Sequence, residues 1–97
     1  MDKKGVLQEL KFKAIRSSGA GGQHVNKVSS KVELTFDITN SKFLSSYEKE
    51  RIIPKLASRL TTENFLILQT DEDRSQHKNK ALVIDRFFDL LENALKV

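Results

Sequence analysis

Hydrophobic and polar positions alternate twice in the first forty residues, which is the period of a half-buried β-strand. The first such segment covers residues 7–15, with Leu10 and Phe12 on one face. The second covers residues 31–38 and alternates more regularly. The intervening residues 17–26 are rich in glycine, serine and asparagine, which are typical of a loop. We therefore expect two neighbouring strands joined by a protruding loop that is too long for a tight hairpin turn.

Residues 45–61 are predicted to be helical. Ser45 or Ser46 can serve as the N-cap, and Glu48 places negative charge in the first turn, where the helix dipole favours it. Pro54 removes a backbone donor and crowds the preceding turn. We therefore expect either a kink at this proline or two short helices.

The rest of the chain is predicted to form a short strand and a long helix. The apolar run at residues 65–68 has the length of a strand and indicates a central or well-covered one. Ser75 is the expected cap of the final helix, which at about 20 residues would be roughly 30 Å long. A hydrophobic stripe at i, i+3/i+4 spacing follows, formed by Ala81, Ile84, Phe87 or Phe88, Leu91 and Leu95.

This order of elements, β-loop-β-α-β-α, predicts an α+β fold. We expect a two-layer sandwich in which helices cover a small mixed sheet. The 97 residues suit one domain, and no apolar run approaches the ~18 residues of a membrane span. The absence of cysteine excludes disulfides and thiolate metal sites. The final helix ends without Gly, Asn or Pro, so we expect that the natural protein continues beyond Val97.

Positive charge is concentrated in the first third of the chain. The net charge is +4, but residues 1–31 carry +5 and residues 32–97 carry −1. Such an excess favours a polyanionic partner, because phosphate contacts supply most of the sequence-independent affinity for nucleic acids. The alternative is a solvated basic face without a partner.

The loop is unusually rich in glycine, with three of the four glycines at Gly19, Gly21 and Gly22. Each glycine costs roughly 0.5–1 kcal/mol of backbone entropy relative to alanine, so the stability of the fold does not favour three of them here. Glycines at these positions instead indicate that the backbone approaches a ligand closely. Gln23 follows with a neutral amide, which can stabilise a developing oxyanion or place a water molecule but cannot act as a strong acid or base. The alternative is a flexible surface loop.

Conventional catalytic patterns are weak in this sequence. No nucleophile-elbow pattern surrounds a serine, and His24 and His77 do not have the spacing of a zinc site. The acidic residues 71–73 could attract a divalent ion, but an acidic turn that caps a helix is the favoured interpretation. The glycine loop also lacks the Lys-Ser/Thr ending of a phosphate-binding loop. We expect neither a metal nor a cofactor.

The run from Arg16 to Ser30, with Gly-Gly-Gln at its centre, is similar to the catalytic loop of class I peptide chain release factors. Most of the remaining chain resembles the single-domain branch of that superfamily. These are the stop-codon-independent ribosome-rescue peptidyl-tRNA hydrolases of the YaeJ or alternative rescue factor B type. Further similarity lies in residues 32–38, 59–61 and 74–79.

The resemblance implies that Gly21, Gly22 and Gln23 are catalytic. They would enter the peptidyl-transferase centre, formed by large-subunit ribosomal RNA. There Gln23 would help water to attack the ester that joins peptide to tRNA, and its side chain could carry a methyl group. The other residues implied to bind ribosomal RNA or to order the loop are Arg16, Ser18, Gly19, His24, Asn26, Lys27, Arg74, Ser75 and Gln76.

The implied partners are the ribosome and peptidyl-tRNA. We expect a monomer without membrane association, in the cytoplasm or, as in some relatives, in mitochondria. Rescue hydrolases also carry a Lys/Arg-rich tail that plugs the empty mRNA channel, whereas here Lys96 is the only basic residue after Arg86. Residues 1–97 are therefore expected to be the catalytic domain without this tail, with intact loop chemistry and weak ribosome binding.

Three other functions remain open at this stage. The chain could be a non-catalytic RNA-binding or ribosome-associated module, in which Lys11, Lys13 and Lys27 matter and Gln23 does not. It could be a fragment of a codon-dependent release factor. It could also hydrolyse peptidyl-tRNA away from the ribosome, which would require a general base, and His24 is the only candidate in the loop.

Overall fold

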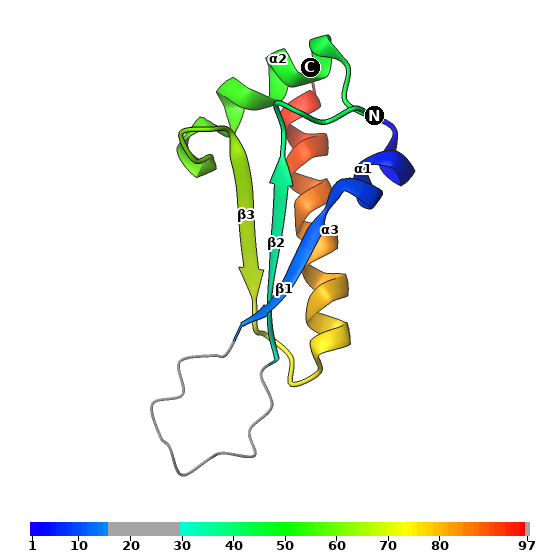
Figure 1. Ribbon diagram of the computed structural model, residues 1–97, viewed down its shortest axis with the longest axis vertical. Helices are drawn as coiled ribbons and strands as arrows, with labels where there is room; N and C mark the ends of the chain where they lie inside the picture. Colours follow the sequence, from blue (N-terminus) through cyan, green and yellow to red (C-terminus); the bar gives the residue numbers. More distant parts are fainter. Residues whose placement is uncertain (16–29, 97) are drawn as a thin grey trace.

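The structure is a computed structural model that describes residues 1–15 and 30–96 (Figure 1). Three helices, one short 3₁₀ turn and three strands follow one another along this part of the chain. In order they are α1 (Lys3–Glu9), β1 (Lys11–Ile15), β2 (Lys31–Asp37), α2 (Ser46–Lys55), the 3₁₀ turn η1 (Ala57–Arg59), β3 (Phe65–Thr70) and α3 (Gln76–Leu95). The helix α3 lies along one face of the sheet and packs against β2 and β3, which confirms the predicted two-layer α+β fold.

The described sheet has the strand order β1-β2-β3, and both pairs are antiparallel. The expectation of a mixed sheet was therefore wrong. The connection from β2 to β3 explains the difference, because α2 and η1 stay at the end of the sheet where β2 finishes (Figure 1). A parallel pairing would need a crossover that returns along the length of the sheet.

β3 was expected to be a central or well-covered strand, but it is an edge strand that pairs with β2. Its two faces differ strongly. Leu66 is fully buried, whereas Ile67 on the opposite face is 42% exposed. A continuous apolar run cannot show which of its residues face solvent, so the sequence did not distinguish this strand from a central one.

The helix α3 buries a stripe of side chains against the sheet. Phe87 meets Phe36 of β2 edge to face, with ring centroids 5.1 Å apart. The buried residues of α3 are Asn79, Val83, Phe87, Leu91 and Ala94. Phe87 and Leu91 were predicted correctly, but Ala81 is exposed, and Ile84 and Leu95 are only partly buried. The stripe is therefore rotated about the helix axis relative to the predicted one.

The helix α1 was not expected, because the sequence pattern suggested a strand from residue 7. Asp2 caps α1 by accepting a hydrogen bond from the Gly5 amide at 3.1 Å. Val6 and Leu10, which are four residues apart, then enter the core on one helical face. This helical spacing over residues 6–10 competes with the strand pattern, so β1 begins only at Lys11.

Both predicted helix caps are confirmed. Ser45 forms a capping box with Glu48, and Ser75 accepts a hydrogen bond from the Lys78 amide. Pro54 lies in the last turn of α2, which ends at Lys55 and is followed by η1. The sequence predicted either a kink or two short helices at Pro54, whereas the ten-residue α2 includes the proline and only the three-residue η1 follows it. No helix among residues 1–15 and 30–96 is long and apolar enough to cross a membrane.

Candidate functional site

The strand ends on either side of residues 16–29 lie at the same end of the molecule as the start of α3 (Figure 1). The last pair of β1 and β2 joins Ile15 to Lys31, and the neighbouring Val32 pairs with Thr70 at the end of β3. The turn after Thr70 leads directly into α3. The base of the glycine-rich loop is therefore built from the two strand ends and this turn.

Most of the predicted site residues lie outside the described part of the chain. These are the three proposed catalytic residues and six of the proposed RNA-binding or loop-ordering residues. They are Gly21, Gly22 and Gln23, with Arg16, Ser18, Gly19, His24, Asn26 and Lys27. Their roles, and methylation of Gln23, stay predictions.

Arg74, Ser75 and Gln76 lie where the chain enters α3. The Ser75 hydroxyl accepts from the Lys78 amide at 3.3 Å, and the Ser75 amide donates to the Asp73 carboxylate at 2.8 Å. The hydroxyl and the amide of Ser75 thus both take part in hydrogen bonds that order the start of the helix. Arg74 and Gln76 are exposed, so both side chains can reach a partner.

Gln76 lines an open groove of about 270 Å³ between β1 and the first turns of α3. Phe12, His77 and Lys80 line the same groove. The Lys80 ammonium lies 4.6 Å from the centre of the Phe12 ring, a cation–π contact that joins α3 to the edge strand. The groove therefore has an apolar wall beside groups that can contact an anion.

The acidic turn at residues 71–73 takes part in local structure. The Asp73 carboxylate accepts from the Ser75 amide, and Glu72 forms an ion pair with Arg86. Within the residues that the structure describes, no group of three or more His, Asp or Glu side chains could hold a metal ion. The interpretation of residues 71–73 as a helix-capping turn fits these contacts better than an ion site.

Asn79 is a residue of this site that was noted only as part of the similar run 74–79 and was not predicted to have a role. Its side chain is completely buried and bonds both to the Ser30 carbonyl and to the backbone of Asp73. A sequence signal did exist, because the four-residue spacing of Asn79, Val83, Phe87 and Leu91 places this polar residue on the apolar face of α3.

Comparisons with known proteins identify the family. The RF-1 domain family matches residues 6–96. The chain is 42% identical over 83 residues to the peptidyl-tRNA hydrolase ArfB of Pseudomonas putida. The aligned region covers 86% of this chain and 60% of that protein. It is 30% identical over 91 residues to the large ribosomal subunit protein mL62 of Mus musculus, covering 94% of this chain and 44% of the relative.

A third relative is peptide chain release factor 2 of Borreliella burgdorferi, with 34% identity over 77 residues. The match covers 79% of this chain and 14% of that protein. The chain thus spans less than two thirds of the length of each of these relatives. The resemblance to class I release factors is confirmed, and the chain belongs to the RF-1 domain family.

Proposed function

We propose that this protein hydrolyses the ester bond of peptidyl-tRNA within the ribosome, independently of a stop codon, and so releases nascent chains from stalled ribosomes. The observation that carries the proposal is the 42% identity to a peptidyl-tRNA hydrolase over 86% of the chain. The Gly-Gly-Gln triplet at residues 21–23 supports it, because these residues suit a site completed by RNA.

In the proposed reaction a water oxygen attacks the carbonyl carbon of the ester. The bond to the ribose oxygen then breaks, and that oxygen leaves with a proton. Gln23 would contribute hydrogen bonds from its backbone N–H and its amide side chain, without acting as a base. The rate would come mainly from holding water and ester in the reactive geometry within the peptidyl-transferase centre.

The described frame supports this role. β1 and β2 pair up to Ile15 and Lys31, so both ends of the loop start from a fixed sheet. The exposed Arg74 and Gln76 lie beside them and would contact ribosomal RNA. We further propose that residues 1–97 act as one catalytic domain and as a monomer, in the cytoplasm or, as for a mitochondrial relative, in that organelle.

A ribosome-dependence assay tests the proposal. Labelled peptidyl-tRNA is offered either free or bound to ribosomes with an empty decoding site, and release is followed with the wild type and with His24→Ala. We expect release only on the ribosome. Release from free peptidyl-tRNA that disappears in His24→Ala would instead establish a hydrolase with its own general base.

The second candidate is an RNA-binding module without catalysis. The exposed Lys11 and Lys13 on β1 favour it, because they add to the basic charge of residues 1–31. Binding to ribosomes without any release of peptide would support this candidate over the hydrolase.

A further inference from the structure

We infer that Asn79 is a positioning residue for the loop that carries Gln23. It is the fourth residue of α3, its side chain is 0% exposed, and it lies on the face that also buries Val83 and Phe87. It touches none of the reacting atoms and would act through the backbone at Ser30. The inference rests on the proposed function, because it concerns the same reaction.

The amide of Asn79 uses both of its donors and its oxygen. The Nδ2 atom donates to the Ser30 carbonyl at 2.6 Å and to the Asp73 carbonyl at 2.8 Å. The Oδ1 atom accepts from the Asp73 amide at 2.9 Å. The orientation is set by these partners, because an exchange of the two amide atoms would direct an oxygen at two carbonyl oxygens.

These bonds join two segments that are distant in sequence. Asp73 lies in the turn before α3, whereas Ser30 immediately precedes β2 and follows Gln23 by seven residues. Ser30 is also one residue beyond the last sheet pair, Ile15–Lys31. The Asn79 bond therefore holds the backbone at Ser30, one residue before β2 begins.

Packing alone does not require an amide at this position. Leucine has the same branched outline with bulkier ends, suits the apolar face of α3, and would not have to be removed from water as a polar group. A buried, fully satisfied amide instead fixes one arrangement of its partners. Because the partner atoms belong to the main chain, the restraint acts on the path of the backbone.

The test compares four proteins in a single assay of peptide release from stalled ribosomes. They are the wild type, Asn79→Asp, Asn79→Leu and the control Val83→Ala. Aspartate keeps the shape and can accept from the Asp73 amide, but when ionised it offers no hydrogen to Ser30. Val83→Ala removes buried volume four residues further along the same face, so it weakens packing without touching Ser30.

Circular dichroism sets a temperature at which every variant is folded, and release is then measured over a range of protein concentrations. We expect both position-79 variants to lose about tenfold to hundredfold in the maximal release rate, since small misplacements of a reacting group cost this much. The half-saturating concentration should not change, and Val83→Ala should keep the wild-type rate. Asn79→Ser, which retains one donor, replaces any variant that does not fold.

Position-79 variants that release peptide at the rate of Val83→Ala would overturn the inference. So would a change confined to the half-saturating concentration, since that would indicate a role in binding. If the wild type released no peptide even with an appended Lys/Arg-rich tail, the proposed function and this inference would both be wrong. Wild-type release with full-rate Asn79 variants would overturn the inference alone.

Discussion

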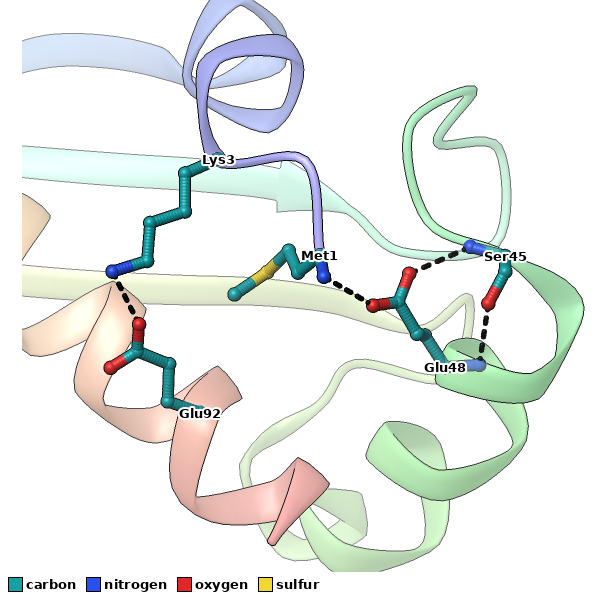
Figure 2. Close-up of polar contacts among 5 residues, drawn as sticks. All are labelled: Met1, Lys3, Ser45, Glu48 and Glu92. Atoms are coloured by element: carbon teal, nitrogen blue, oxygen red, sulfur yellow. Dashed lines mark hydrogen bonds and ion pairs between the residues drawn. The ribbon is translucent and has the colours of Figure 1, made fainter.

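The N-terminal ammonium of Met1 lies 2.8 Å from Oε2 of Glu48 (Figure 2). The other carboxylate oxygen accepts from the Ser45 amide at 2.9 Å, and the Ser45 hydroxyl accepts from the Glu48 amide at 3.1 Å. One carboxylate thus closes the capping box of α2 and holds the first residue of the chain. Nearby, Lys3 forms an ion pair with Glu92, which joins α1 to α3.

The first prediction concerns the acid stability of this contact. Burial acts to raise the pKa of Glu48, but the ammonium and the Ser45 bonds outweigh it and hold that pKa below its ordinary value of 4.5. A carboxylate with a lowered pKa contributes stability above its unfolded pKa, and this contribution is lost as the pH falls through the folded pKa. Glu48→Gln should therefore reduce stability at neutral pH and flatten its decline in acid.

Urea unfolding followed over a range of pH values measures this effect, with Glu63→Gln as the control at an exposed glutamate. The free energies of unfolding of Glu48→Gln and Glu63→Gln should converge at low pH. There the Glu48 that the control retains is protonated in both the folded and the unfolded state. If the free energy of unfolding of Glu48→Gln differed from that of the control by the same amount at every pH, the lowered pKa of Glu48 would be contradicted.

The second prediction tests α1. A Cβ atom at Gly5 would overlap the ring of Phe43 and lie 2.8 Å from the Asp2 carboxylate that caps the helix. Gly5→Ala should lower the free energy of unfolding by about 1–3 kcal/mol, the usual cost of overpacking. The partner variant Phe43→Ala should recover part of this loss, and thermal unfolding of the two single variants and the double variant measures the coupling.

The third prediction concerns the bare backbone of the loop. Replacing Gly22 with valine adds a branched side chain where the proposed function requires close approach to RNA and ester. Peptide release should be lost, while the melting temperature should stay within the range of the wild type. Release at the normal rate by Gly22→Val would show that the glycines are not needed for access.

The fourth prediction separates specific RNA contact from general charge. Lys11→Gln/Lys13→Gln removes two charges from β1, and Lys4→Gln/Lys42→Gln removes two exposed charges that lie outside β1. Each lost phosphate contact should reduce the salt slope of ribosome binding by about 1. The salt slope should therefore fall by about 2 for the β1 variant and by close to 0 for the control variant. Equal slopes for the two variants would argue against contact of β1 with phosphate.

Local rules account for the parts of the fold that were predicted correctly. The strict alternation of β2 predicted a strand with one buried face, and Val32, Leu34 and Phe36 are indeed buried. The caps at Ser45 and Ser75 follow from the hydrogen-bond chemistry of serine before a helix. These features depend on residues that are close in sequence.

The features that were missed depend on contacts between distant residues. The antiparallel direction of β3 follows from where α2 packs, and α1 is stabilised by burial of Val6 and by the ion pair of Lys3 with Glu92. The bond from Asn79 to Ser30 spans 49 positions. Neither periodicity nor a motif in one segment specifies such a pair. The Gly-Gly-Gln loop, in contrast, was recognised from residues that are adjacent in sequence.

The most direct test of the proposed hydrolase measures peptide release from ribosomes that carry labelled peptidyl-tRNA and no codon in the vacant site. The chain and its Gln23→Ala variant are compared, each with and without an appended Lys/Arg-rich tail. We predict release that requires Gln23 and increases with the tail, while Gln23→Ala unfolds at the wild-type temperature. Equal release by the wild type and Gln23→Ala, or no release by any version despite ribosome binding, would contradict the account.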